Sequence, residues 1–526
     1  MALYRAFATV GGLTMLSRVL GFVRDILFAA AFGSGWVADA FNIAFRFPNL
    51  FRRLFGEGAF NSAFVPLFAK RLEGEGREAA RQFAEEAMAG LVLVIALVSA
   101  VCMIFMPWLM YLLAPGFSVD QPKFDLAVLL TRITFPYLLC MSLVALLSGV
   151  LNAFGRFVES SSVSIILNVT LAIAIFIGFG LGYGNDPAGG ITQAIGVTIA
   201  GVLQLGHLLW GMRRIGFTLR LRWPRMTDGM RRLVGLGVPG IVAGGVTQLN
   251  IMIGTMIASM QPGAVSQLYY ADRLYELPLA IVGIAIGVVL LPEVSRHLRA
   301  GDMAAVNDSQ NRSLEFAMLL TMPAAIALAV IPSQIVSVLF QRGAFTPADT
   351  AATSAALAIF ALGLPAFVLI KVFSPAYFAR EDTRSPMRYA AISLTANTAG
   401  SAALFFLFRE IGIMPHLGIA VATTLGGWLN AALLWGGLSR NGNFATDTRT
   451  RRNLLLIVLA SLVMGAELVA AAVGLAPWFA PANPLHVRAA ALAALVLAGA
   501  AAYFAIAYAL GAFRLGTLKG AISRRG

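Results

Sequence analysis

Residues 454–473 read LLLIVLASLVMGAELVAAAV, an apolar stretch in which Glu467 is the single charged residue. At 1.5 Å per residue, a helix of this length crosses the hydrocarbon core of a bilayer. Comparable runs recur at residues 90–113, 165–181 and 489–510. The chain is 59% hydrophobic and only 12% charged, whereas soluble domains carry about twice that charge. We therefore expect an all-α polytopic membrane protein.

A pass along the 526 residues predicts about fourteen transmembrane helices joined by short loops, with no soluble domain. The spans are expected near residues 7–32, 37–68, 84–113, 124–153, 158–181, 190–212, 230–259, 266–297, 310–340, 349–378, 386–409, 416–438, 453–474 and 487–512. The two cysteines lie inside apolar runs, so no disulfide framework is expected.

The Lys and Arg residues outside these spans lie almost entirely at the N-terminus, on alternate loops and in the C-terminal tail. The opposite side holds Lys123, Arg342, Arg409 and Arg488, in loops or at the ends of spans. The positive-inside rule then places both termini in the cytoplasm, as an even number of spans requires. The net charge of +14 is thus a topology signal with affinity for anionic membrane lipids, and nucleic acid is not expected as a partner.

The first six spans and the next six look like two copies of one unit. Phe64-Val65-Pro66 recurs as Leu290-Leu291-Pro292, and Arg46-Phe47-Pro48 recurs as Glu276-Leu277-Pro278. Chance matching of apolar helices is the alternative, but the prolines keep nearly constant offsets. Because six is even, the copies would be two six-helix lobes related by a pseudo-two-fold axis along the membrane normal. The predicted division is an N-lobe at residues 1–225, a C-lobe at 226–445, and two C-terminal helices at 446–526.

Charged residues inside the first span are informative, because a charge at mid-bilayer costs at least ~2.5–3.5 kcal/mol unless it faces a cavity or a partner. The span carries LSRVLGFVRD at residues 16–25. At 100° per residue, Arg18 and Asp25 nearly coincide on the helix surface while Arg24 lies to one side. The pair Arg18 and Arg24 either lines a cavity or stabilises helix packing.

Two further spans carry charges at helical spacing. In the second, Arg53 and Glu57 are four residues apart and can form a pair, which leaves Arg52 for a ligand. In the eighth, Arg273 and Glu276 are three residues apart and share a face. Because the repeat relates these two spans, Arg52 and Arg273 are expected to face one another across a shared cleft.

Arginines that converge in a low-dielectric cavity require an anion. Guanidinium groups form bidentate, charge-assisted bonds to phosphate oxygens, so a pyrophosphate is the natural ligand for Arg18, Arg24, Arg52 and Arg273. Asp39, near the outer end of the second span, is either an interfacial residue or a gate charge. The roles of Arg132, Lys371 and Glu467, each a single charge in its span, stay open.

Five segments together carry a family resemblance: 16–25 (LSRVLGFVRD), 51–66 (FRRLFGEGAFNSAFVP), 269–278 (YYADRLYELP), 339–345 (LFQRGAF) and 374–386 (SPAYFAREDTRSP). They resemble the MurJ (MviN) family of the MOP exporter superfamily. The resemblance implies transport of lipid II, the undecaprenyl-pyrophosphate-linked precursor of peptidoglycan, across the bacterial inner membrane. It also implies two lobes around a central cavity and a groove for the lipid tail at the last two helices. The positions that match the family's functional residues are Arg18, Arg24, Asp39, Arg52, Arg273 and Glu276.

Some members of that family have a sodium site among helices 7, 11 and 12. Here Asn250, Thr395 and Asn397 are polar residues of those helices, yet no carboxylate lies inside them. The resemblance therefore leaves a sodium site in doubt, and a proton gradient or the membrane potential becomes the expected energy source. No metal site and no cofactor are expected.

We therefore interpret the chain as a lipid II flippase that works by alternating access, and not as an enzyme. The alternative within the superfamily is an O-antigen-type flippase or a drug/cation antiporter, although a cation exporter would need an acidic cavity. A polyprenyl-dependent glycosyltransferase would need a catalytic acidic cluster in a large loop, and a scaffold would not explain the buried arginines. The expected partners are lipid II, membrane lipids and possible wall-synthesis proteins.

Overall fold

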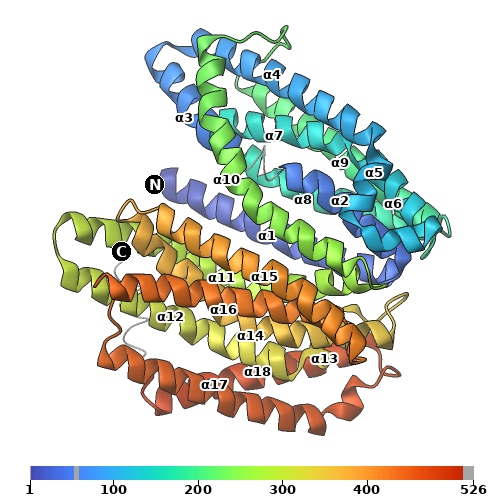
Figure 1. Ribbon diagram of the computed structural model, residues 1–526, viewed down its shortest axis with the longest axis vertical. Coiled ribbons are helices and arrows are strands. Elements are labelled where there is room, and N and C mark those ends of the chain that lie inside the picture. Colours follow the sequence, from blue (N-terminus) through green and yellow to red (C-terminus); the bar gives the residue numbers. More distant parts are fainter. Residues whose placement is uncertain (1, 53–58, 513–526) are drawn as a thin grey trace. The chain divides into compact units, whose positions relative to one another are not determined.

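The computed structural model describes residues 2–52 and 59–512, although for several stretches within these ranges only the backbone is described. In this part of the chain the structure consists of α-helices and two short 3-10 helices, without a β-strand (Figure 1). The predicted all-α class is confirmed. Arg53 and Glu57 lie outside the described residues, as does the side chain of Arg52.

The helices up to the middle of the chain are α1 (Ala2–Phe32), α2 (Trp36–Arg52), α3 (Ala59–Gly74), α4 (Arg77–Ile104), α5 (Met106–Leu113), η2 (Pro115–Val119), α6 (Gln121–Thr134), α7 (Pro136–Ala153), α8 (Phe157–Gly180), α9 (Pro187–Arg214) and α10 (Asp228–Ala258). The others are α11 (Ala264–Arg299), α12 (Met303–Val330), α13 (Pro332–Phe340), α14 (Pro347–Phe378), α15 (Arg384–Glu410), α16 (His416–Arg440), α17 (Thr448–Gly474), η3 (Ala476–Phe479) and α18 (Leu485–Ala509).

Each predicted span coincides with one helix or with two consecutive helices. Prolines explain three of the divided spans, because proline is tolerated in the first turn of a helix but interrupts its interior. Pro107 lies in the first turn of α5, Pro136 begins α7 and Pro332 begins α13. Among the described residues, ten helical segments are long and apolar enough to cross a membrane. The other four predicted spans correspond to α1, α2 with α3, α10 and α11, so the count of fourteen stays a prediction.

The chain divides into two compact units. Unit 1 comprises the residues up to Ser266 together with Arg342–Thr346, and unit 2 comprises Gln267–Gln341 and the residues from Pro347 onward. Helix α10 therefore belongs to unit 1 by its contacts. The lobe boundary expected after residue 225 was drawn from the sequence repeat, and it stays a prediction.

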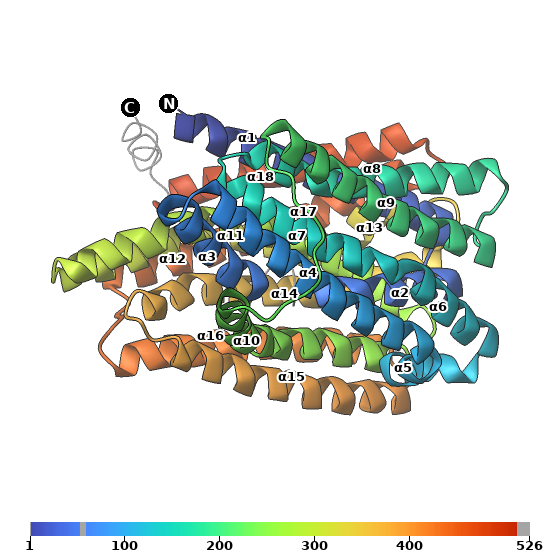
Figure 2. The same cartoon turned by 90° about the horizontal axis from the view of Figure 1, so that it is seen from above.

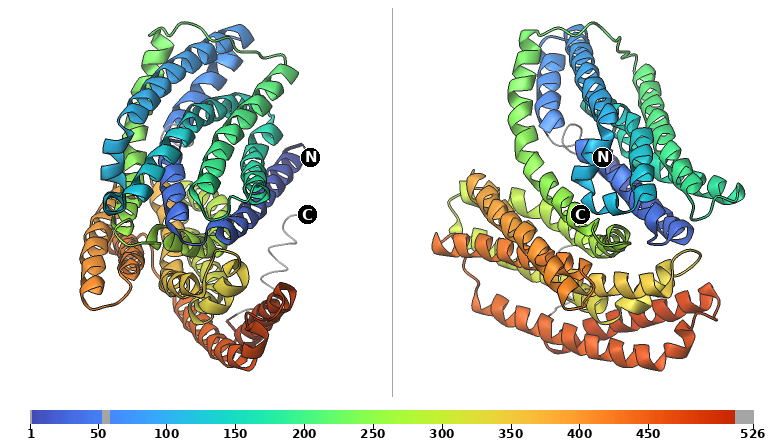
Figure 3. Two further views of the ribbon diagram at one scale, coloured as in Figure 1. Left: turned by 90° about the vertical axis from the view of Figure 1, so that its right-hand side faces the viewer. Right: turned by 45° about the vertical axis from the view of Figure 1, so that its right-hand side comes forward.

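The two units pack their helices in the same order. In unit 1, α9 packs against α8 and α7, and α4 packs against α7. In unit 2, α16 packs against α15 and α14, and α12 packs against α14 (Figure 2). These helices are counterparts in the predicted repeat, so the internal packing of each unit agrees with it. The additional helices α17 and α18 lie side by side (Figure 3), and α17 packs on α12.

Two glycines, each in the turn after a short helix, make similar close contacts inside unit 1. A Cβ atom on Gly116, in the turn after α5, would lie 2.2 Å from the carbonyl oxygen of Ser259 at the end of α10. A Cβ atom on Gly343, in the turn after α13, would lie 2.2 Å from the carbonyl oxygen of Ala30 near the end of α1. Gly343 also has a φ of +58°, which favours glycine. In each turn, glycine thus allows a close approach to the end of another long helix of unit 1, α10 for Gly116 and α1 for Gly343.

Candidate functional site

The charges of α1 are held partly by α8. Arg24 and Asp25 are both buried, and an Arg24 Nη2 atom lies 2.6 Å from Asp25 Oδ1. Arg24 also donates to the side-chain oxygen of Asn168 on α8 at 3.1 Å, and the Asn168 amide donates to the carbonyl of Ser17 at 2.9 Å. A buried guanidinium is tolerated where it is paired and hydrogen-bonded. Arg24 therefore contributes to the packing of α1 on α8, whatever else it binds.

Arg18 lies one and a half turns earlier on α1 and its side chain is exposed. The described residues of unit 1 do not bury this guanidinium as they bury that of Arg24. In a chain that spans a membrane, an exposed arginine on the inner part of a long helix faces water, lipid headgroups or a ligand, since exposure to hydrocarbon is costly. Arg18 is consequently the more accessible of the two predicted ligands on this helix.

Arg273 and Glu276 on α11 form the ion pair that their spacing predicts. Arg273 Nη1 lies 3.2 Å from Glu276 Oε2, and both side chains are part-exposed. The Arg273 guanidinium also lies 4.9 Å from the centre of the Tyr269 ring, an arrangement that favours a cation over an aromatic face. One carboxylate and one ring thus orient a guanidinium that solvent still reaches.

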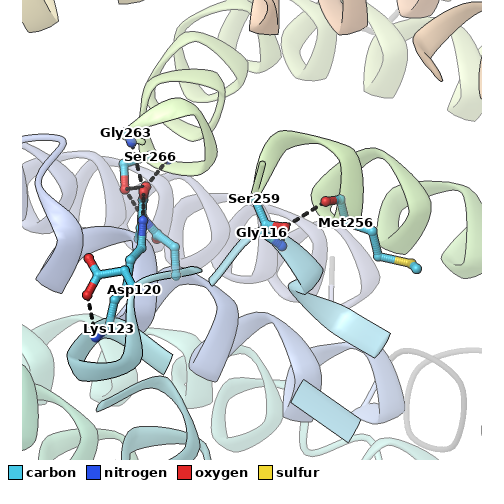
Figure 4. Close-up of polar contacts among 9 residues, drawn as sticks. Gly116, Asp120, Lys123, Met256, Ser259, Gly263 and Ser266 are labelled. Carbon is cyan, nitrogen blue, oxygen red and sulfur yellow. Dashed lines mark hydrogen bonds and ion pairs between the residues drawn. The ribbon is translucent and has the colours of Figure 1, made fainter. Parts of the chain in front are cut away.

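Asp39 on α2 is a buried carboxylate that accepts from four donor groups on three residues. It is 0% exposed, and its Oδ2 atom lies 2.7 Å from the ammonium of Lys123 on α6. The same oxygen accepts from the backbone N–H of Gly263 at 2.9 Å, while Oδ1 accepts from the N–H and the hydroxyl of Ser266 at 3.0 and 2.8 Å. Gly263 and Ser266 flank the start of α11, so Asp39 caps that helix from another element. Figure 4 shows Gly263 and Ser266 above Lys123 and Asp120 in the same part of the view.

Neighbouring contacts reinforce the same end of unit 1. Asn42, almost one turn after Asp39, donates to the Ser266 hydroxyl at 3.0 Å. The N–H of Gly116 donates to the hydroxyl of Ser259 at 3.1 Å, and that hydroxyl donates to the carbonyl of Met256 (Figure 4). The Lys123 ammonium lies 4.1 Å from the centre of the Phe117 ring. We call Asp39, Lys123, Gly263 and Ser266 the Asp39 cluster.

Sequence reasoning missed Lys123 and Asn168. Lys123 was assigned to a loop, but it lies in the first turn of α6, where Asp120 caps the helix. Its side chain is 5% exposed. Asn168 is one polar residue in an apolar span and carries no charge to draw attention. A polar residue opposite a buried charge was the signal available, but it could be used only once α1 was known to pack on α8.

The predicted convergence of four arginines stays a prediction. Arg18, Arg24 and Arg52 belong to unit 1 and Arg273 to unit 2, and each unit is described by itself. Within unit 1, Arg46 of α2 donates to the hydroxyl of Thr255 on α10, so this arginine has a partner inside the protein.

Three residues, each a single charge in its predicted span, differ in their surroundings. Arg132 is exposed, and its Nε atom donates to the carbonyl of Met103 at 3.0 Å, which caps the end of α4. Lys371 and Glu467 are exposed side chains of α14 and α17. Their roles stay open.

The polar residues considered for cation binding form hydrogen bonds within the protein where their side chains are described. Among the described residues, no group of three His, Cys, Asp or Glu side chains could hold a metal ion. The Asn397 side-chain oxygen accepts from Ser401 at 3.2 Å and from Thr423 at 3.4 Å, and the Thr395 hydroxyl donates to the carbonyl of Ala391. The Asn250 side chain lies outside the description.

The comparisons with known proteins agree with one another. Residues 28–487 match the family model described as "Lipid II flippase MurJ". The "Probable lipid II flippase MurJ" of Rhizobium tropici is 44% identical over 530 residues, which cover 100% of this chain and 97% of the relative. The solved structure "Lipid II flippase MurJ, inward closed conformation" matches with a TM-score of 0.76 and 25% identity, over 94% of this chain and 97% of that one.

A multidrug resistance MATE family transporter of the MOP superfamily, in an inward-facing conformation, matches with a TM-score of 0.66 at 12% identity, over 83% of this chain and 98% of that one. At that identity the match shows a shared fold alone. The helical architecture and the match over most of the sequence lead to one conclusion: this multi-pass membrane protein belongs to the lipid II flippase MurJ family.

Proposed function

We propose that this chain flips lipid II across the bacterial cytoplasmic membrane by alternating access. The observation that carries the proposal is 44% identity to a "Probable lipid II flippase MurJ" over 100% of this chain and 97% of that relative. The physical requirement agrees with it. A lipid whose pyrophosphate must cross the bilayer needs cationic groups at membrane depth, and α1 and α11 carry them.

In this proposal Arg18, Arg24, Arg52 and Arg273 bind the pyrophosphate. The exposure of Arg18 and the oriented, part-exposed guanidinium of Arg273 support those two residues most directly. Arg24 is buried against Asp25 and Asn168. Its contribution would therefore be to position Arg18 on the same helix rather than to hold the phosphate alone. Glu276 orients Arg273 through their ion pair.

The Asp39 cluster is proposed as the closure on the side that the charge distribution predicts to be periplasmic. It joins α2 of the first repeat copy to the start of α11 in the second copy. Opening that side requires Asp39 to release the two N–H groups and the hydroxyl. A ligand can drive such a change only if it binds the two states differently.

The decisive experiment is flipping by the purified full-length chain in proteoliposomes that contain fluorescent lipid II. We expect protein-dependent access of lipid II to an impermeant quencher, with no such effect for a polyprenyl-linked O-antigen precursor.

Replacing sodium with potassium at constant membrane potential should leave the rate of flipping largely intact, while collapse of the potential should stop it. Export of a cationic dye without lipid II movement would instead assign the chain to the drug antiporters of this fold. Loss of flipping in sodium-free medium would disprove the coupling, and not the substrate.

A further inference from the structure

The segment that joins α9 to α10 is fixed to α4. We define residues 217–227 as the basic strap, which has no helical structure between the end of α9 and Asp228. Glu85 of α4 accepts from the Arg220 N–H at 2.9 Å and forms an ion pair with the guanidinium of Arg222. At the far end, the Thr227 hydroxyl donates to Glu86 at 2.7 Å. Figure 1 shows this connection passing the end of α4.

An aromatic cluster fixes the near end of the strap. Phe217 is 0% exposed and packs against Phe68 and Phe154 at centroid separations of 5.9 and 5.0 Å. The guanidinium of Arg77 lies 5.4 Å from the centre of the Phe154 ring and donates to the carbonyl of Ile215 at 2.9 Å. The strap is therefore anchored at both ends, and the orientation of its outer side chains follows from that anchoring.

Between its anchors the strap presents its largest apolar side chains outward. Leu221 is 66% exposed, Trp223 85% and Met226 62%. A soluble surface seldom leaves three such side chains within six residues in water, and large exposed apolar side chains close together indicate an interaction surface. Arginines stand between them, in the order Leu221, Arg222, Trp223, Pro224, Arg225, Met226.

The arginines of the strap differ in whether a carboxylate pairs with them. Arg222 is paired with Glu85, while Arg220 and Arg225 are exposed and take part in no ion pair with the residues that the structure describes. Arg214, at the end of α9, lies 3.7 Å from the centre of the Trp210 ring, whose side chain is 48% exposed. The whole surface offers cations beside apolar tips, which is complementary to a phosphate headgroup above acyl chains.

The position of the strap indicates which kind of molecule binds to it. It connects α9 to α10 and lies on the first turns of α4, and the α4 and α9 segments are long and apolar enough to span the membrane. It therefore lies at the boundary between bilayer and water, where tryptophan and arginine are favoured. The charge distribution predicts that this is the cytoplasmic boundary, where anionic lipids attract basic segments.

We propose that the basic strap is a binding site for anionic phospholipid headgroups. Arg220 and Arg225 bind the phosphates, and Leu221, Trp223 and Met226 insert below them. Glu85, through the Arg220 N–H, and Glu86, through the Thr227 hydroxyl, hold the strap so that the site is formed before lipid arrives. This site is separate from the proposed lipid II pathway and does not depend on the substrate.

The test places a fluorescent probe on the strap of the full-length protein. In a background with Cys102→Ala and Cys140→Ala, Trp223→Cys is labelled with an environment-sensitive fluorophore, and the protein is reconstituted into nanodiscs. We expect emission at shorter wavelength, and quenching by spin-labelled lipid, when phosphatidylglycerol replaces part of the phosphatidylcholine. Arg220→Gln with Arg225→Gln should weaken this dependence by about fivefold per arginine removed.

The matched control is Arg449→Gln with Arg452→Gln, which removes two exposed arginines at the start of α17. It should leave the response of the strap unchanged, and both double variants should unfold at the parent's temperature. The proposal is overturned if the probe stays water-exposed in both lipids, or if the control variant weakens the response equally. A disulfide between copies at position 223 would overturn it too, by assigning the surface to a second copy of the chain.

Discussion

Asp25 and Asp39 are both buried carboxylates of unit 1 with a cationic partner, but they connect different parts of the chain. Asp25 pairs with the adjacent Arg24, which reaches Asn168, so this cluster joins α1 to α8 within one repeat copy. Asp39 pairs with Lys123 and accepts from Ser266, 227 residues away, so its cluster joins α2 and α6 to the start of α11. In the alternating-access cycle proposed above, the Asp25 cluster stays intact in both states, whereas the Asp39 cluster opens on the side that is predicted to be periplasmic. Under that proposal the same interaction chemistry stabilises packing in one place and a conformational state in the other.

The largest effect is expected for Asp39→Asn. The change leaves the Lys123 ammonium buried without its counter-charge, which costs about 3–5 kcal/mol when one partner of a buried pair is removed. Thermal unfolding of the purified protein measures the loss. Adding Lys123→Met should recover much of it, because an apolar side chain of similar size replaces the unpaired charge. Equal losses for the single and double variants would show that the Lys123 pair contributes little.

Gly343→Ala should destabilise by about 1–3 kcal/mol, because a Cβ atom cannot fit 2.2 Å from the Ala30 carbonyl without moving backbone. Gly116→Ala should behave alike against Ser259. Gly442→Ala provides the control: its φ of +66° is similarly strained, but a Cβ atom there meets nothing within 4 Å. If Gly343→Ala and Gly442→Ala unfold at the same temperature, backbone strain explains the effect at Gly343 and the close approach does not.

Asn168→Ala should cost about 1–3 kcal/mol, since it removes one of the hydrogen-bond acceptors of the buried Arg24 side chain. In contrast to Asp39→Asn, it should not change the distribution between conformations, as measured by crosslinking between α2 and α11. A shift in that distribution would contradict the distinction between the two clusters.

The smallest effect concerns Asp382, in the loop between α14 and α15. Hydrogen bonds from Ser385 hold the pKa of this carboxyl below its ordinary value of 3.8. A depressed pKa in the folded state contributes stability that is present above the unfolded pKa and lost as the pH falls through the folded one. The unfolding temperature of the parent should thus decline slightly more than that of Asp382→Asn when the pH is lowered below about 4. Parallel curves would show that the hydrogen bonds contribute nothing.

The parts of this fold that sequence could predict are those with a local cause. Hydropathy located the helices, and spacing on one helix predicted the Arg273–Glu276 pair. The division of spans at Pro136 and Pro332 follows from proline chemistry, although it had not been predicted. The partners of Asp39 could not be predicted in this way, since they depend on which helix ends meet.

Arg24 illustrates the same limit. Its charge and depth marked it as a ligand candidate, and nothing in the sequence indicated that Asn168, 144 residues later, would hydrogen-bond it. Arg24 is buried and Arg18 is exposed, and this difference arises from tertiary packing. Residue type identified the set of candidates, and the structure distinguishes a packing arginine from an accessible one.

The most direct test of the account is lipid II binding by Arg18→Ala and Arg273→Ala, measured with the purified full-length protein alongside its thermal unfolding. Arg409→Ala, which removes an exposed arginine at the end of α15, is the control. A hydrogen bond to a charged group contributes about 1.5–3 kcal/mol, so each of the two variants should bind roughly 10- to 150-fold more weakly than the parent, at an unchanged unfolding temperature. Parental affinity in both variants would contradict the account, because the pyrophosphate would then be bound elsewhere.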